Sequence, residues 1–271
     1  SYFLNERIKS LDLVAAQSPE PQQVGGLPVI LDHFSVDRVI GSLPEEKLTP
    51  FNKENYLKAL DNYYYEENAE ESWFLNDYYS NWKRLWTTLK EEEIPYARPT
   101  RGTTLYRGEF PGPNGKTIRL EVLHPGEDFY YESYASSNRS LVLSLRVEDG
   151  PSFLFPGDLR EAGQEDLVEA FSPEKLQHDV LVVPANGMQR SSVRDSFVNA
   201  VDPKKLVFST GAPEIKGPLA DSLEKSLKKN VRKARSLVDK ENIYRTDRDY
   251  AITLTTEGDK VDVSTVADEE K

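Results

Sequence analysis

The sequence contains no cysteine, which excludes disulfide bonds and thiolate metal sites. Histidine is also scarce, with 3 residues in a chain of 271, so few imidazole groups are present to bind a metal. The sequence has no run of about 18 apolar residues that could span a membrane. Its N-terminus also lacks the basic-then-apolar pattern of a secretion signal. We therefore expect a soluble chain without a membrane segment.

Basic residues are fewer than acidic residues. The 34 lysines and arginines stand against 46 aspartates and glutamates, which gives a formal net charge of −12 and a pI near 4.9. This balance argues against a broad basic surface for nucleic acid. One local basic run, Leu223–Lys240, stands out. A charge run on a helix is usually a solvated face, so the sequence leaves nucleic-acid binding open.

The centre of the chain contains an ordered series of short apolar runs. They predict a β-hairpin over residues 140–155, whose second strand leads to Asp158 in a tight turn. After a polar, helix-like segment, a third run over residues 180–183 leads to a turn at residues 185–187. Two buried strands therefore end in tight turns, which is where α/β proteins carry functional side chains.

This arrangement resembles the metallo-β-lactamase fold, in particular the soluble hydrolase-like domain of ComEC-type DNA-uptake competence proteins. That family has a strand ending in Gly-Asp, here Gly157-Asp158. A later strand ends in Val-Pro-His-His-Gly, and here residues 183–187 read Val-Pro-Ala-Asn-Gly. The resemblance implies an α/β fold with a single domain over residues 1–271, an αββα sandwich of two mixed sheets flanked by helices. The family's first strands have no counterpart. We expect that they are missing from this chain, and the alternative is that another polypeptide supplies them.

The family's metal-binding positions have lost most of their ligands. A Ser-His-x-Asp-x-Asp-His-x-Gly-Gly segment, aligned through Gly25-Gly26, holds two metal ions in the family together with the Gly-Asp and His-His turns. Tight binding of a divalent metal needs imidazole or carboxylate ligands, and only Glu20 and Asp158 keep such a group here. We therefore predict no metal, no cofactor and no catalytic residue. The resemblance places seven residues in the degenerate ancestral cleft: Ser18, Glu20, Gln22, Gln23, Asp158, Ala185 and Asn186.

The three histidines fall outside the family's motif. We expect His33 and His178 at the surface or at helix ends, and His124 at a strand end.

Two other catalytic schemes lack support. A Ser–His–Asp site would need Ser18, Ser191 or Ser192 beside a histidine, and a carboxylate pair would need Glu20 beside Asp158. No glycine-rich loop of the kind that binds nucleotide phosphates precedes a helix.

Three hypotheses for the function follow. The first is a catalytically inactive, metal-free ComEC-like domain that serves as a binding or structural module. The alternative is an active hydrolase or nuclease of the same superfamily, with zinc or manganese held by a rebuilt site. The third is a domain that binds DNA without cutting it. This third hypothesis is favoured if six basic residues form one exposed helix face: Lys225, Lys228, Lys229, Arg232, Lys233 and Arg235.

The chain leaves the family pattern over residues 42–101, where we predict a helical insertion. Apolar residues recur at helical spacing over residues 52–68 and 71–93. Trp82 belongs to the expected core, whereas surplus aromatic residues such as Trp73 leave room for a protein partner. Residues 262–271 are predicted as a flexible tail. A cytoplasmic location and the extracytoplasmic part of a larger protein both stay open.

Overall fold

The computed structural model describes residues 8–18, 21–42, 73–109, 115–127, 136–211 and 218–266. The chain divides into two compact units. The first comprises Ser1–Thr100 and Pro125–Leu141, and the second comprises Arg101–His124 and Val142–Lys271. Each unit is described in turn.

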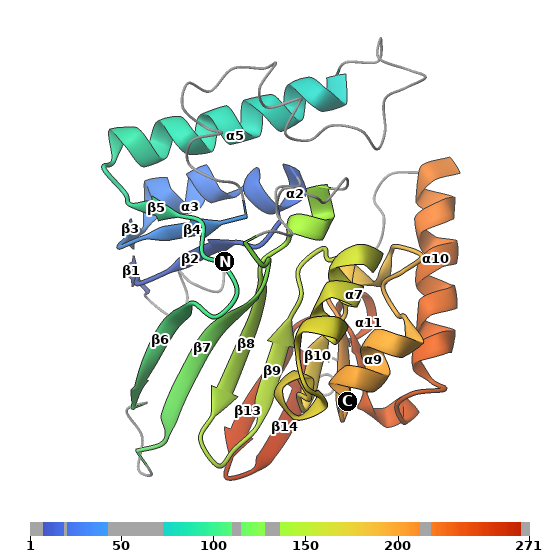
Figure 1. The fold of residues 1–271 in the computed structure, drawn as a ribbon. Helices are drawn as coiled ribbons and strands as arrows, with labels where there is room; N and C mark the ends of the chain where they lie inside the picture. The colour runs from blue at the N-terminus through green and yellow to red at the C-terminus, as the bar shows by residue number, and fades with distance from the viewer. Residues whose placement is uncertain are drawn as a thin grey trace. The chain divides into compact units, whose positions relative to one another are not determined.

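The first unit contains two small parallel sheets and several helices (Figure 1). One sheet has the strand order β2-β4-β5, and the other pairs β1 with β3. The strands are β1 (Ser10–Leu11), β2 (Val14–Ala16), β3 (Ser35–Val36), β4 (Val39–Gly41) and β5 (Tyr96–Ala97). The helices are α2 (Pro21–Val24), α3 (Leu27–His33), α5 (Trp73–Glu91) and the 3₁₀ turn η2 (Ser136–Arg139).

Helix α5 packs on α2 and α3 through one apolar stripe. Trp82, Leu85 and Leu89 recur at spacings of three and four residues, which places them on one helix face. All three are buried, in one cluster with Val24 and Leu27. The predicted helix over residues 71–93 is therefore confirmed over Trp73–Glu91, with Trp82 in the core. The other predicted helix, over residues 52–68, lies outside the described residues.

The second unit is built on a seven-stranded mixed sheet with the strand order β12-β11-β10-β9-β8-β7-β6. Strands β6 to β9 pair antiparallel, and strands β9 to β12 pair parallel. The predicted hairpin over residues 140–155 is confirmed as β8 and β9. The strands are β6 (Thr104–Glu109), β7 (Thr117–His124), β8 (Val142–Val147), β9 (Ser152–Phe155), β10 (Val180–Val182), β11 (Lys205–Phe208) and β12 (Ile243–Arg245).

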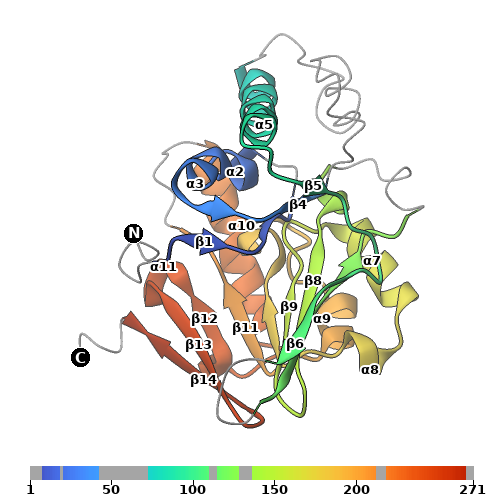
Figure 2. The ribbon, with the colours of Figure 1, turned by 90° about the vertical axis from the view of Figure 1, so that its left-hand side faces the viewer.

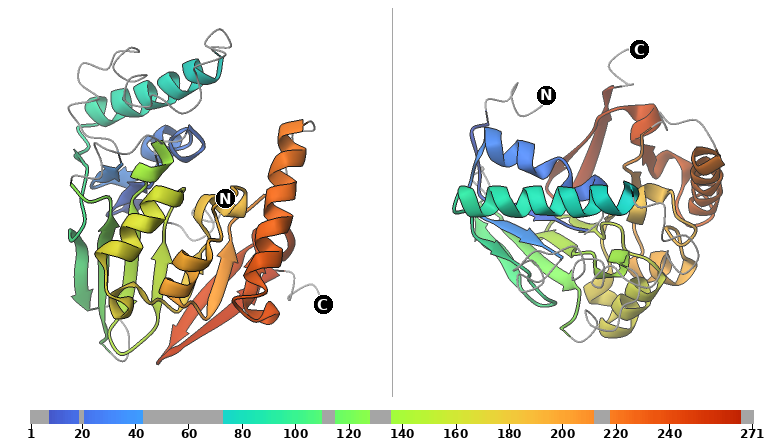
Figure 3. Two further views of the ribbon diagram at one scale, coloured as in Figure 1. Left: turned by 45° about the vertical axis from the view of Figure 1, so that its right-hand side comes forward. Right: turned by 90° about the horizontal axis from the view of Figure 1, so that it is seen from above.

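Helices connect the parallel strands and cover one face of the sheet (Figure 3). Each new parallel strand is added on the same side of the previous one, and such crossovers are right-handed, so their helices lie on one face. These elements are α7 (Glu161–Ala170), α8 (Pro173–Leu176), η3 (Pro184–Gly187), α9 (Asp195–Val201), α10 (Pro218–Ala234) and η4 (Lys240–Asn242).

Alternate side chains of these strands build two different cores. Leu154, Leu181 and Leu206 point to the helices and join the cluster that contains Phe197 of α9. The neighbouring residues Phe153, Val180 and Val207 belong to a separate cluster on the opposite face. The sheet of the second unit is therefore buried on both faces.

A C-terminal β-hairpin covers that opposite face (Figure 2). After the short helix α11 (Thr246–Asp249), β13 (Ile252–Glu257) pairs antiparallel with β14 (Lys260–Thr265). Apolar residues of both strands, Ile252, Leu254 and Val261, pack on the sheet. This corrects the prediction of a tail beginning at residue 262, because residues 262–265 complete β14 through an alternating apolar pattern.

The fold is thus α/β, with a mixed seven-stranded sheet as its largest element. Within the described ranges, no helix is both long and apolar enough to cross a membrane.

Candidate functional site

The candidate site lies along the carboxyl edge of the four parallel strands in the second unit. Asp158 follows β9, Ala185 and Asn186 follow β10, Thr210 follows β11 and Thr246 follows β12. Because parallel strands end at the same edge, their following turns gather there, and α/β proteins bind ligands at this edge.

The turn after β10 has an unusual backbone. Ala185, Asn186 and Gly187 have φ values of 49°, 56° and 73°, a left-handed conformation that L-residues other than glycine rarely adopt. The Ala185 N–H donates a 2.8 Å hydrogen bond to the carbonyl of Gly157. This bond joins the turns after β9 and β10, and it places the backbone at Ala185 beside the residue that precedes Asp158.

Two contacts hold this turn in place. A side chain at Gly187 would put its Cβ 2.3 Å from the ring of Phe208, a fully buried residue of β11. The position therefore requires glycine for its space as well as for its φ angle. From α10, the buried Asn230 side chain donates hydrogen bonds to the carbonyls of Gly187, at 2.8 Å, and Gln189, at 2.6 Å. The amide NH₂ group thus ties α10 to the turn.

The structure divides the seven predicted cleft residues between the two units. Asp158 is 3% exposed, Ala185 is also buried, and Asn186 is half-buried, all in the second unit. In the first unit, Ser18 is buried and Gln23 is half-buried. Gln22 belongs to α2, and Glu20 lies outside the described residues. The structure brings together the two turns that carry Asp158 and Ala185. That all seven residues form one cleft stays a prediction.

Two of the three histidines have roles in local structure. His33 is exposed at the end of α3, as predicted, and its Nδ1 donates to the carbonyl of Val29 at 2.8 Å. His124 is fully buried at the end of β7, also as predicted. Its Nδ1 donates to a carboxylate oxygen of Asp166 at 2.9 Å, and the same oxygen accepts from the guanidinium of Arg101. This group ties β7 to α7.

The prediction that His178 lies at the surface or at a helix end is wrong as to its exposure. His178 is 2% exposed, just before β10, where it joins the core between α8 and the sheet. Its Nδ1 lies 2.8 Å from the carbonyl of Leu176, and its Nε2 lies 2.7 Å from the hydroxyl of Ser144. A carbonyl only accepts, so Nδ1 carries the proton and Nε2 accepts from Ser144.

Burial, and after it the nearby positive charge of Arg146, lowers the pKa of His178 to about 4. The ring is therefore neutral at pH 7.

The contact between Ser144 and His178 has the atoms of a nucleophile–base pair. Both side chains are almost completely buried, so no substrate reaches them. The sequence analysis considered Ser18, Ser191 and Ser192 for this role and missed Ser144, because Ser144 and His178 come together only through the sheet.

The residues at the carboxyl edge do not fit a zinc or manganese site. Asp158 supplies a carboxylate, but Ala185 has no donor atom and Asn186 offers only a neutral amide, which binds such ions weakly. The imidazole groups are bound elsewhere, as described above. In the part of the chain that the structure describes, no three His, Asp or Glu side chains gather in a way that could hold a metal ion.

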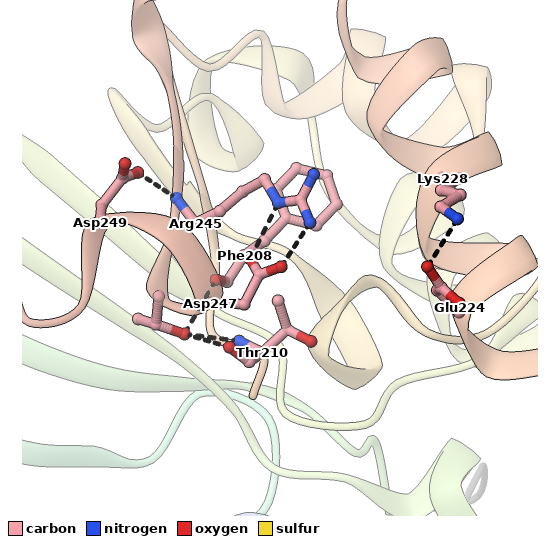
Figure 4. Close-up of polar contacts among 8 residues, drawn as sticks. Phe208, Thr210, Glu224, Lys228, Arg245, Asp247 and Asp249 are labelled. Carbon is pink, nitrogen blue, oxygen red and sulfur yellow. Dashed lines mark hydrogen bonds and ion pairs between the residues drawn. The ribbon is translucent and has the colours of Figure 1, made fainter. Parts of the chain in front are cut away.

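The end of β12 carries a polar network that the sequence analysis did not predict (Figure 4). The Thr246 hydroxyl donates to the carbonyl of Thr210 at 2.6 Å and accepts from its N–H at 2.7 Å. Arg245 donates from Nε and Nη2 to the two carboxylate oxygens of Asp247, at 2.9 and 2.5 Å. Its backbone N–H donates to Asp249 at 2.7 Å. Arg245, Thr246 and Asp247 are adjacent in the sequence, whereas their partner Thr210 follows β11 and their partner Asp249 belongs to α11.

Helix α10 presents its basic residues on one face. Leu227, Asn230, Val231 and Ala234 are buried on the side that faces the sheet. At 100° per residue, the basic side chains fall within about 160° on the opposite side. All of them are exposed except Lys233, which is half-buried and pairs with Asp195 at 3.2 Å: Lys225, Lys228, Lys229, Arg232, Lys233 and Arg235. We call these six residues the basic face of α10.

Comparison with known proteins gives one distant relative. No known family model matches the sequence. The chain is 22% identical over 204 residues to ComE operon protein 3 of Bacillus subtilis (strain 168). The match covers 75% of this chain and 20% of that protein, so it spans about a fifth of the relative's length. This finding supports a distant relation to ComE proteins. It agrees with the resemblance to competence proteins noted above. It does not bear on the metallo-β-lactamase fold.

Proposed function

We propose that this chain is a non-catalytic relative of the ComEC hydrolase-like domain, of metallo-β-lactamase-like architecture, that binds DNA without cutting it. The observation that carries this proposal is the basic face of α10. Five of its six basic residues lie on one side of α10 and Arg235 follows the helix directly; all six are exposed except Lys233, which is half-buried.

The charges on this face are available to a ligand. Lys228 pairs with Glu224 at 2.6 Å, and Lys233 pairs with Asp195. The remaining four cations, Lys225, Lys229, Arg232 and Arg235, form no hydrogen bond or ion pair with any other described residue. Phosphate binding releases condensed counterions from DNA, which makes such a row of free cations a favourable contact surface. The chain has a net charge of −12, so this row is a local concentration of positive charge in an otherwise acidic protein.

The carboxyl edge of the sheet supports the non-catalytic part of the proposal. Hydrolysis in this superfamily would use metal-bound hydroxide, and the donor set at the edge does not fit the metal. What remains is a pair of tight turns held by backbone hydrogen bonds and by Asn230. We infer that this edge supports the fold around the binding surface.

The setting follows from the relatives. The distant relative is named as a product of the ComE operon, and the resembling family takes part in DNA uptake. A domain that holds DNA without degrading it would suit such a setting, because the imported strand has to survive.

A binding measurement with a matched control tests this proposal. Fluorescence anisotropy of labelled single- and double-stranded oligonucleotides, measured in EDTA, should show saturable binding that weakens as salt is raised. The double variant Lys229→Glu/Arg232→Glu should lose at least about tenfold in affinity. Arg107→Glu/Lys260→Glu changes the net charge equally at exposed positions away from α10 and should stay close to wild type.

The hydrolase alternative makes the opposite prediction. If the purified chain cleaves labelled DNA on addition of zinc or manganese, and EDTA stops the cleavage, the non-catalytic proposal is wrong. If both double variants lose affinity equally, binding is a general charge effect and the assignment to α10 fails.

A further inference from the structure

A small hollow lies beside the end of α10 in the second unit. Its volume is about 100 Å³. Seven residues line it, four of them cationic and one anionic: Val231, Arg235, Lys240, Ile243, Arg245, Arg248 and Asp249. We call it the β12 hollow, because Ile243 and Arg245 belong to that strand.

Three of the four cations in the hollow have no internal partner. Arg235 follows α10, Lys240 belongs to η4 and Arg248 belongs to α11. All three side chains are exposed, and none forms a hydrogen bond or ion pair with another described residue. Their charges come from three separate segments of the chain and converge on one hollow.

The fourth cation, Arg245, is already balanced. Its guanidinium is held at two points by the carboxylate of Asp247, and both side chains are largely buried, at 12% and 16% exposure (Figure 4). Asp249, the single acidic residue of the lining, accepts the backbone N–H of Arg245. The hollow therefore keeps a positive surplus from Arg235, Lys240 and Arg248 after its own acidic groups are counted.

The helix dipole explains only a part of this arrangement. A cation near the carboxyl end of a helix is stabilising, which accounts for Arg235. Lys240 and Arg248 lie beyond α10, so the dipole gives no reason for their position. The single carboxylate of Asp249 does not balance the charges of Arg235, Lys240 and Arg248, and a bound anion would reduce the repulsion that remains among them.

The backbone near Arg248 is also constrained. Tyr250 ends α11 with φ 55° and ψ −120°, a conformation that is costly for any residue except glycine. Such a geometry persists only where its surroundings hold it. It fixes the course of the chain immediately after Arg248 and Asp249.

We propose that the β12 hollow is a binding site for one phosphate group. A hollow of about 100 Å³ has room for a tetrahedral oxyanion. Guanidinium groups donate paired hydrogen bonds to phosphate oxygens, and lysine adds a point charge. The phosphate is either inorganic or the terminal group of a larger ligand that stays outside the hollow. This inference does not require the DNA-binding proposal, although Arg235 belongs both to the basic face of α10 and to the hollow.

Titration with inorganic phosphate tests the site. Isothermal titration calorimetry of the full chain, at low and constant ionic strength, should show saturable binding at a single site. Arg248→Ala and Lys240→Ala should each weaken it by about tenfold or more, since each removes a charged donor. Arg107→Ala removes an exposed arginine of β6, away from the hollow, and should bind as wild type does. Circular dichroism and the melting temperature check that each variant is folded.

Two further measurements separate the sources of the phosphate. If an oligonucleotide with a 5′-phosphate binds more tightly than the same oligonucleotide without it, and Arg248→Ala removes the difference, the site takes a terminal phosphate. If the two oligonucleotides bind equally, and inorganic phosphate alone still binds wild type but not Arg248→Ala, the site takes the free ion. Either result supports the site. The proposal is overturned if wild type shows no saturable phosphate binding, or if Arg107→Ala weakens it as much as Arg248→Ala. Phosphate binding without DNA binding would leave this site standing while the proposed function fails.

Discussion

The turns after β9 and β10 and the region around α10 have opposite properties. The turns contain glycines with positive φ at 157 and 187, and at Asp158, Ala185 and Asn186 they carry one carboxylate and no imidazole. The region around α10 and the β12 hollow lies outside the family's motifs, yet it carries exposed cations that form no ion pair or side-chain hydrogen bond with another described residue. Asn230 links the two regions, because it belongs to α10 and bonds the turn.

The difference shows what each kind of feature depends on. A tight turn between buried strands is maintained by packing and backbone hydrogen bonds, so it remains when its side chains change. An exposed charge contributes little to stability, so stability alone does not explain why several of them converge. We therefore expect substitutions in the turns to change stability, and substitutions around α10 to change binding. Four predictions test this contrast, from the largest expected effect to the smallest.

The first prediction concerns the tightest packing in the turns. Gly187→Ala should lower the free energy of unfolding by about 3–4 kcal/mol, because it adds left-handed strain to overpacking against Phe208. Gly258→Ala is the matched control. It also has a positive φ, but no atom lies within 4 Å of the added Cβ, so only the strain of about 1 kcal/mol should appear. Urea denaturation measures both. Equal losses would contradict the packing argument.

The second prediction tests the buried histidine by pH. In the folded chain the pKa of His178 is about 4, and in the unfolded chain it is about 6.5. Between these values the unfolded state binds one more proton, so the stability is complete above pH 6.5 and falls as the pH is lowered to about 4. The full loss is about 3 kcal/mol. In the variant His178→Gln the side chain at position 178 cannot be protonated, so the stability of the variant should depend less on pH between pH 6.5 and pH 4.

Unfolding of wild type and His178→Gln in urea at pH 7 and pH 5 measures this difference, and NMR titration of the ring follows the protonation directly. A ring that gains its proton near pH 6.5 in the folded protein would show that His178 is accessible to solvent, against the burial described above.

The third prediction concerns the link between the two regions. Asn230→Ala removes the donor for two backbone carbonyls and should cost about 2 kcal/mol. Ser236→Ala is the control, since it removes an exposed hydrogen bond to the carbonyl of Lys233 and should cost less than about 0.5 kcal/mol. If α10 is positioned by this link, Asn230→Ala should also weaken DNA binding although it changes no charge. Unchanged stability would mean that the turn does not depend on α10.

The smallest effect is a gain in stability. Ala185→Gly relieves the left-handed strain at φ 49°, and part of the gain is offset by the greater freedom of glycine in the unfolded chain. We expect about 0.5–1 kcal/mol of stabilisation. Ala200→Gly, inside α9, should instead destabilise by about 1 kcal/mol. A loss of stability in Ala185→Gly would show that the alanine methyl group contributes more by packing than its backbone strain costs.

Much of the local structure was predictable from the sequence. The apolar runs that form β8, β9 and β10, and the spacing of Trp82, Leu85 and Leu89 in α5, depend on periodicities that each segment displays by itself. The order of motifs also placed Asp158 and Ala185 at strand ends. The surface position of His178 and the tail beginning at residue 262 were wrong, because a polar or charged residue does not reveal from its own neighbours that another element will cover it or pair with it.

The candidate site was predictable only in part. The sequence indicated which residues follow β9 and β10, and it indicated a basic run in α10. It did not indicate that the Ser144 hydroxyl faces His178, that Asn230 bonds the turn, or that Arg248 and Arg235 line the same hollow. Each of these pairs joins elements that are distant in the sequence, and no local pattern records their proximity.

By itself, the sequence determined the secondary structure of the central hairpin and of α5, the absence of a carboxylate or imidazole at positions 185 and 186, and the charge of α10, because these follow from the residues and their spacing. Only the tertiary structure decided which cations remain without partners and where they converge. An ion pair or hydrogen bond depends on two atoms meeting in space, and the right-handed crossovers of the parallel sheet set which segments meet. Three cations of the β12 hollow, which follow α10 or belong to η4 and α11, have no side-chain partner among the described residues, and that folding brings them to one hollow.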